Sequence, residues 1–302
     1  IGEIFPEIEQ VRFAKTGSDV CMAAVRLARA VTGRDLILSY GYHGTATDFI
    51  IPPDNRGIPQ AIQDLRTEFR WENKENLIRA ARDAACVIVE VPPVDHKENT
   101  IEFLNGCRDL AHKNGALFIL DEVVTGFRLS LRGATGYYGV IPDLWWFGKA
   151  MANGYAVSAI GGRAELMEEF QKGVFFSGTF FDDPLGLAAA AETLRILKER
   201  EDEIYPLLWD RGNELIVGFN RLANQHQVSA RIVGQAPRSV IQFGEGNEDR
   251  FYADETRRKF SLEMLTRGVL MDRPNFITRA HTTGIIKQTL GIVEEVFGEM
   301  KK

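Results

Sequence analysis

Two charged side chains near the middle of the chain each follow an apolar segment, and together they could do carbonyl chemistry. Residues 116–120 read Ala-Leu-Phe-Ile-Leu and are followed by Asp121, whereas residues 145–147 read Trp-Trp-Phe and are followed by Gly148 and Lys149. Continuous apolar runs of this kind predict strands buried in a parallel sheet. Because open α/β sheets bind ligands at the carboxyl ends of their strands, we expect Asp121 and Lys149 at a ligand-binding edge.

The neighbours of Lys149 predict an apolar setting for its amine. Aromatic residues precede it, and Ala150 and Met151 follow it. Apolar surroundings disfavour the ammonium form and lower the pKa of a lysine, and a neutral amine is the form that attacks a carbonyl group. Taken alone, an aspartate at a strand end is more often a turn or cap residue, and most lysines are solvated. The pair indicates function only together with motifs elsewhere in the chain.

The composition is that of an ordinary globular protein. The chain has 302 residues, of which 45% are hydrophobic and 26% charged, enough for one large domain or two. The net charge of -6 argues against nucleic acid as a partner, because phosphate binding needs an excess of Lys and Arg. There is no apolar run long enough to cross a bilayer and no signal-peptide pattern at the start, so no membrane association is expected. The three cysteines and five histidines lack metal-ligand spacing, which predicts reduced thiols, a cytoplasmic location and no metal site.

Strand and helix patterns alternate over the first 200 residues, which is typical of a parallel α/β sheet. A different order follows, and we therefore expect two domains: a large domain over residues 1–200 with a mostly parallel sheet, and a small α+β domain over 201–302. The first nine residues predict the end of a helix. The expected strands cover 11–15, 35–39, 85–91, 116–120, 157–162, 228–234, 239–243 and 276–279, and the main helices 20–31, 77–84, 100–114, 185–200, 203–224, 250–267 and 283 onward.

Two glycine-containing turns could meet a ligand. Residues 16–19, Thr-Gly-Ser-Asp, precede an amphipathic helix, with Ser18 as the predicted N-cap. A helix start of this kind offers free amides and a positive dipole end to a phosphate. Residues 41–44, Gly-Tyr-His-Gly, allow a close approach of the backbone to a ligand. Each turn alone is weak evidence, because most Gly-Ser helix starts bind nothing and the tyrosine could simply pack in a loop.

Four motifs stand in one order along the chain: residues 16–19, residues 41–44, Asp-Glu-Val-Val-Thr-Gly-Phe-Arg at 121–128, and Phe-Gly-Lys-Ala at 147–150. In this order they resemble the class III pyridoxal-phosphate-dependent aminotransferases, in particular the glutamate-1-semialdehyde aminomutase-like branch. Ser-Gly-Thr at 177–179 and Ala-His-Thr at 280–282 also match, so the resemblance extends along nearly the whole chain. It implies an α/β large domain of the type I fold of pyridoxal-phosphate (PLP) enzymes, which is aspartate aminotransferase-like, and a small α+β C-terminal domain.

The resemblance implies pyridoxal 5'-phosphate as cofactor and assigns two catalytic residues. Lys149 would form an aldimine with the cofactor and then act as general acid and base. Asp121 would pair with the pyridinium nitrogen and keep it protonated, so that the ring can accept electrons. The backbone amides of Gly17 and Ser18 would hold the phosphate.

The same resemblance implies five further cofactor-binding positions. Tyr42 and Val123 would pack on the two faces of the ring, although core packing explains both residues equally well. Thr179 would reach the phosphate of the neighbouring subunit's cofactor, which predicts a homodimer; a helix cap is the alternative for this residue. His43 and Glu90 lie near the cofactor in the family pattern.

The expected reaction is transamination between a small-molecule amino donor and a carbonyl acceptor. One alternative is a glutamate-1-semialdehyde-type 2,1-aminomutase, which moves the amino group within one molecule. Another is a degenerate PLP-binding subunit, because the N-terminal segment that family members carry before residue 11 is expected to be missing; the presence of Asp121, Lys149 and Thr179 argues against it. A nucleotide-binding α/β protein is disfavoured, since the chain lacks a glycine-rich phosphate loop with Lys-Ser/Thr.

Overall fold

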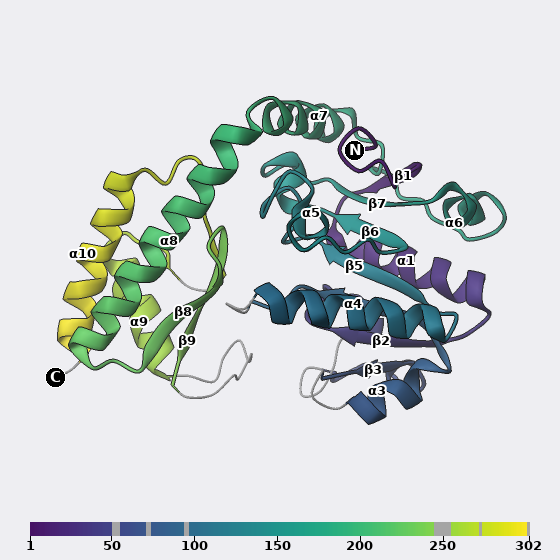
Figure 1. Cartoon of the computed structure of the whole chain (residues 1–302), viewed down its shortest axis with the longest axis horizontal. Coiled ribbons are helices and arrows are strands. Elements are labelled where there is room, and N and C mark those ends of the chain that lie inside the picture. The colour runs from purple at the N-terminus through teal and green to yellow at the C-terminus, as the bar shows by residue number, and fades with distance from the viewer. Residues whose placement is uncertain (50–54, 71–73, 94–96, 245–254, 272–273, 301–302) are drawn as a thin grey trace. The chain divides into compact units, whose positions relative to one another are not determined.

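The computed structural model describes residues 1–49, 55–70, 74–93, 97–244, 255–271 and 274–300. The chain divides into two compact units (Figure 1). The first unit comprises Ile1–Pro92 and His96–Arg200, and the second comprises Pro93–Asp95 and Glu201–Lys302.

The first unit is built on one sheet of seven described strands, in the order β1-β7-β6-β5-β4-β2-β3. Neighbours from β3 to β6 are parallel, whereas β7 runs antiparallel to both β6 and β1. The expected α/β class with a mostly parallel sheet is therefore confirmed. The strands are β1 Gln10–Ala14, β2 Leu36–Tyr40, β3 Arg66–Glu68, β4 Ala84–Glu90, β5 Leu117–Glu122, β6 Leu144–Phe147 and β7 Ser158–Gly162.

Helices cover both faces of this sheet (Figure 1). Helix α1 packs with Ile88, Ile119 and Trp146 in one buried cluster. Because side chains alternate along a strand, the neighbouring residues Phe118 and Trp145 point to the opposite face, where α4 contacts β4 and β5. The helices of this unit are α1 Gly17–Thr32, α2 Gln60–Gln63, α3 Lys74–Ala81, α4 Lys97–Lys113, α5 Gly133–Tyr138, α6 Ala164–Met167 and α7 Pro184–Glu199, with short 3-10 turns η1 Thr47–Phe49, η2 Lys149–Ala152 and η3 Glu168–Gln171.

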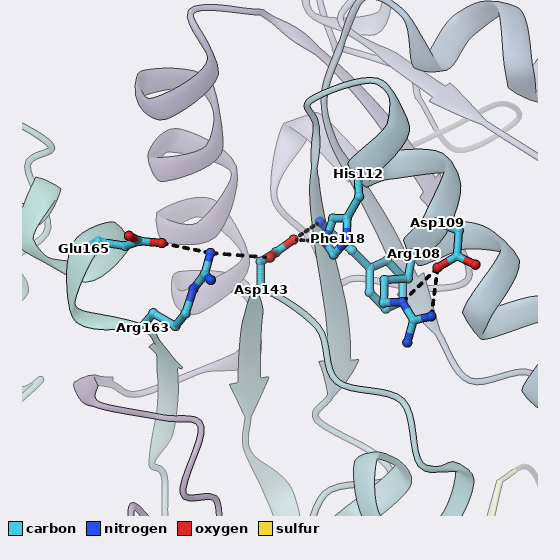
Figure 2. A network of polar contacts seen from close by, with 7 residues as sticks. All are labelled: Arg108, Asp109, His112, Phe118, Asp143, Arg163 and Glu165. Carbon is cyan, nitrogen blue, oxygen red and sulfur yellow. Dashed lines mark hydrogen bonds and ion pairs between the residues drawn. The ribbon is translucent and has the colours of Figure 1, made fainter.

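A polar network holds the edge of the sheet at which β5 and β6 begin (Figure 2). Asp143 Oδ2 accepts hydrogen bonds from the Phe118 amide at 2.8 Å and from His112 Nε2 at 2.9 Å. Arg163 Nη2 lies 4.0 Å from Asp143 Oδ1 and 2.8 Å from Glu165 Oε1. The network therefore joins α4, β5 and the start of β6 at the edge opposite the carboxyl ends of these strands.

The first nine residues form turns, so the prediction of a helix end there is wrong. Ile4, Phe5 and Ile8 are buried, and the Phe5 ring lies 5.0 Å from the Phe147 ring and 5.6 Å from the Phe127 ring. The apolar residues of this segment pack into the large unit's core as an irregular chain.

The second unit contains α8 Glu201–His226, β8 Ala230–Gln235, β9 Arg238–Phe243, α9 Glu255–Thr266, β10 Asn275–Phe276 and α10 Thr283–Met300. Three strands in the described part of this unit form an antiparallel sheet in the order β10-β9-β8. Phe219, Phe260 and Phe297 make a buried aromatic cluster between the helices, with ring centroids 5.2–5.9 Å apart. Residues 250–254 of the helix predicted over 250–267 lie outside the described residues.

None of the helices in the described ranges is long and apolar enough to span a membrane.

Candidate active site

Asp121 and Glu90 lie side by side at the carboxyl edge of the parallel strands. They pair in register across β5 and β4, and Asp121 pairs with Trp146 on the other side. Lys149 follows two residues after the end of β6. The fold thus brings the three side chains to the edge at which open α/β sheets bind ligands.

Two donors orient the carboxylate of Asp121, which is only 3% exposed. The Val123 amide donates to Oδ1 at 3.0 Å, and His43 Nδ1 lies 2.8 Å from Oδ2. The His43 ring is also buried and meets the Trp146 ring edge-on at 5.9 Å. His43 Nε2 has no hydrogen-bond partner among the described residues, so Nδ1 is the ring nitrogen that pairs with Asp121.

The turn at residues 16–19, which was predicted to bind phosphate, is the start of α1, and the N-cap of this helix is Thr16. Thr16 Oγ1 accepts from the Asp19 amide at 3.3 Å, while the Asp19 carboxylate accepts from the Thr16 amide at 2.8 Å. The prediction of Ser18 as the N-cap is therefore wrong; the Thr-x-x-Asp spacing of a capping box was the signal for the correct residue. In the described part of the chain the amides of Gly17 and Ser18 donate no hydrogen bond, so they remain available at the positive end of the helix.

The 41–45 loop is tied to both of its neighbours. The hydroxyl of Ser18 accepts from the Thr45 amide at 3.1 Å, and a methyl group at Gly44 would lie 2.4 Å from this oxygen. The carboxylate of Glu90 accepts from the Tyr42 amide at 3.0 Å. Glu90 thus holds the loop that carries Tyr42, whose own side chain is 58% exposed.

Val123 is the point at which three of these segments converge. A methyl group at Gly17 would lie 3.3 Å from Val123 Cγ2, and one at Gly148 would lie 3.5 Å from Val123 Cγ1. The half-buried Val123 side chain therefore lies between the start of α1 and the residue before Lys149.

Lys149 is exposed, so the apolar setting expected for its amine is not found. The aromatic residues before it fill β6, which ends at Phe147, and the chain then turns into η2 with a left-handed φ of 41° at Lys149. Such a backbone is strained for a residue with a side chain, and strain of this kind clusters at functional sites. Burial raises the pKa of the Cys21 thiol in α1; the charge of Asp121 raises it further and that of Lys149 lowers it. Both charges therefore act on the same part of α1.

No hydrogen bond or ion pair joins Thr179 to the other predicted residues within the described ranges. It is exposed in a turn before α7. The N-cap of α7 is Asp183, whose Oδ2 accepts from the Gly186 amide at 3.1 Å and from Lys15 Nζ at 2.8 Å. The Lys15 hydrogen bond holds the pKa of Asp183 below its ordinary value. A helix cap is thus not the role of Thr179, and its contact with a neighbouring cofactor stays a prediction.

Cys21, Cys86 and Cys107 are free and buried. Among the residues described, no group of three or more His, Cys, Asp or Glu side chains is arranged to hold a metal ion. The absence of a metal site stays a prediction.

The chain is similar to known proteins over nearly its whole length. A family model described as "Aminotransferase class-III" matches residues 1–294. The glutamate-1-semialdehyde 2,1-aminomutase of Methanothermobacter thermautotrophicus is 36% identical over 330 residues, and that of Neisseria meningitidis serogroup C is 31% identical over 335; each match covers 99% of this chain and 77% of the relative.

Solved structures share the fold. The PLP internal aldimine form of the FumI protein from Sphingopyxis sp. MTA144 superposes with a TM-score of 0.84 at 27% identity, covering 98% of this chain and 72% of that one. A structure described as a transaminase with PLP bound superposes with a TM-score of 0.86 at 21% identity, covering 99% of this chain and 75% of that one. The expected fold type I architecture is confirmed.

Proposed function

The chain belongs to the class III aminotransferase family, and from this membership we propose that it moves an amino group from a small-molecule amino donor to a carbonyl acceptor with pyridoxal phosphate. The sequence predicted an enzyme of this family with pyridoxal phosphate as cofactor. Both predictions are confirmed by the family match and by the cofactor-bound form of a similar structure. The observation that carries the proposal for this chain is the buried carboxylate of Asp121, which two donors hold at the same sheet edge as Lys149.

The residues at this edge fit the cofactor. The free amides of Gly17 and Ser18 at the start of α1 suit an anionic phosphate. Asp121 suits a protonated ring nitrogen, and the Val123 side chain offers an apolar surface to one ring face. When bound, pyridoxal phosphate supplies an electron sink for the negative charge that develops at the substrate carbon.

In this proposal Asp121 keeps a proton on the ring nitrogen, and His43 and the Val123 amide keep the carboxylate turned toward it. Glu90 holds the 41–45 loop through the Tyr42 amide, and the Tyr42 ring would pack on the second ring face. Lys149 would hold the cofactor through Nζ, and its amine would then carry a proton to and from the substrate carbon. Lys149 is exposed, so its amine is accessible to small molecules.

We further propose a homodimer in which Thr179 contacts the partner's cofactor. The segment around Thr179 supports a protein contact, because Phe175 is 72% exposed and Phe180 68% exposed, and large apolar side chains exposed together mark interaction sites. The cytoplasmic location, the division into domains at residue 200 and the individual site residues likewise remain predictions.

A second candidate reaction is the 2,1-aminomutase reaction. It is favoured by the name of relatives that are 31–36% identical to this chain. Because both reactions use the same cofactor chemistry, the residues at the sheet edge suit either one.

The test is an absorption experiment on the purified chain loaded with pyridoxal phosphate, with Lys149→Ala as the control. Transamination predicts a visible band that an amino donor bleaches and a keto acceptor restores. If the chain isomerises glutamate-1-semialdehyde without any added acceptor, it catalyses the 2,1-aminomutase reaction. A wild-type chain that gives no band, or whose band no amino compound bleaches, contradicts both reactions.

A further inference from the structure

Glu122 is a buried carboxylate to which the proposed mechanism gives no role. Its side chain is 0% exposed, and burial raises its pKa. It accepts hydrogen bonds from the Thr125 hydroxyl, from the Ala134 amide at 2.9 Å, and from the amide and hydroxyl of Thr135 at 2.8 and 3.0 Å. These residues, together with Trp145, are called the Glu122 cluster below.

The cluster requires an acceptor on both oxygens of Glu122. Oε1 accepts from the Thr135 amide and Oε2 from the Ala134 amide, and a backbone amide can only donate. A glutamine would direct its NH2 group at one of these two N–H groups, so an isosteric amide cannot replace the carboxylate. A buried, fully hydrogen-bonded carboxylate is costly, and it constrains the groups around it in return.

The cluster fixes the strand end that carries Asp121. Successive side chains of a strand point to opposite faces, so Asp121 faces His43 while Glu122 faces the start of α5. The turn after β5 packs tightly on Glu122: the Gly126 amide donates to its carbonyl at 2.8 Å, and a methyl group at Gly133 would lie 2.5 Å from Oε2. The backbone at Asp121 is thus held from the face opposite its own side chain.

The cluster also reaches the strand that leads to Lys149. Trp145 Nε1 donates to the Thr135 hydroxyl oxygen at 2.9 Å. Trp145 lies in β6, and Glu122 itself pairs in register with Phe147, two residues before Lys149. One buried network therefore joins the ends of the two strands that deliver the aspartate and the lysine.

We propose that Glu122 is a positioning residue that clamps the carboxyl ends of β5 and β6, so that Asp121 and Lys149 keep a fixed mutual position around the cofactor. This inference rests on the proposed function for the identity of the cofactor. It assigns no proton transfer to Glu122.

Glu122→Gln is the variant that tests the clamp, and Asp143→Asn is its matched control. Both replace an acid by its isosteric amide, and both acids accept a backbone amide, but Asp143 lies where β5 and β6 begin (Figure 2). Thr135→Val is a second variant, which removes the hydroxyl between Glu122 and Trp145 and keeps the side chain's shape.

Two readouts separate positioning from mere stability. The first is the NMR resonance of the His43 ring in the cofactor-free protein, which reports on its hydrogen bond to Asp121. The second is the Kd for pyridoxal phosphate. We expect Glu122→Gln and Thr135→Val to shift the His43 resonance and to weaken cofactor binding by about tenfold, a change of one decade in Kd. Asp143→Asn should lower the melting temperature but leave both readouts at the wild-type values.

The clamp is refuted if Thr135→Val and Glu122→Gln keep the wild-type His43 resonance, or if Asp143→Asn shifts it equally. A wild-type protein that does not bind pyridoxal phosphate would refute the proposed function instead, and the His43 resonance would still decide for or against the clamp.

Discussion

The bond between His43 and Asp121 can be measured by a double-mutant cycle with His43→Phe and Asp121→Ala. His43 Nδ1 lies 2.8 Å from Asp121 Oδ2, and both side chains are buried. Phenylalanine keeps an aromatic ring against Phe49 and Trp146 and removes the Nδ1 donor. The two single variants also change other terms: the first removes the unpaired Nε2 and the second leaves the Val123 amide without its acceptor. These terms cancel in the cycle, which isolates the energy of the pair.

The structure sets the expected size of this coupling. A hydrogen bond to a charged group contributes about 1.5–3 kcal/mol, and the His43 and Asp121 side chains are only 0% and 4% exposed. We therefore expect a coupling of about 1.5–3 kcal/mol in the free energy of unfolding. Urea denaturation of the cofactor-free wild type, both single variants and the double variant measures it.

A coupling below about 0.5 kcal/mol, the range found for independent sites, would refute the reasoning. The control cycle pairs His43→Phe with Thr179→Ala. No hydrogen bond, ion pair or ring contact joins these two residues in the described part of the chain, so their effects should add.

Three further predictions concern the packing and the buried groups. Gly44→Ala should lower the free energy of unfolding more than Gly139→Ala does. Both glycines have left-handed φ angles, for which a side chain costs about 1–2 kcal/mol, but of the two only Gly44 would place its new methyl group against another residue, Ser18 Oγ at 2.4 Å. Equal losses in urea titrations would count against the loop geometry. No cysteine of the native protein should react with a thiol reagent at mildly alkaline pH, since burial raises the pKa of Cys86 to about 12 and the other two thiols are also buried; one fast-reacting thiol before denaturation would contradict this. Burial raises the pKa of Glu122, so the native state binds the carboxyl proton more tightly than the unfolded state does. The free energy of unfolding of the wild type, relative to that of Glu122→Gln, should therefore fall as the pH rises from the ordinary carboxyl pKa through the raised one. A relative stability that grows with pH would contradict this direction.

Much of the large unit could be predicted because its central strands are buried on both faces. The apolar runs that became β4, β5 and β6 read as continuous hydrophobic segments, and the polar residues after them mark the edge where Asp121 lies. Strand β3 escaped prediction because its sequence, Arg-Thr-Glu, carries no apolar run; pairing with β2 alone makes it a strand.

Tertiary contacts explain the details that the sequence did not indicate. His43 and Asp121 are 78 residues apart, and no local pattern predicts that their side chains meet. Thr16 and Ser18 both carry a hydroxyl that could cap α1. Thr16 is the cap because it exchanges hydrogen bonds with Asp19, and the Ser18 hydroxyl accepts from the Thr45 amide instead. The exposure of Lys149 follows from the end of β6 at Phe147, a boundary that composition alone does not fix.

In the proposed mechanism, Lys149 is the residue that binds pyridoxal phosphate covalently. The most direct test is borohydride reduction of the cofactor-loaded wild type, followed by peptide mass spectrometry. We expect the reduced cofactor on the peptide containing Lys149 and on no other lysine. Stable labelling of a different lysine, with Lys149 unmodified, would contradict it.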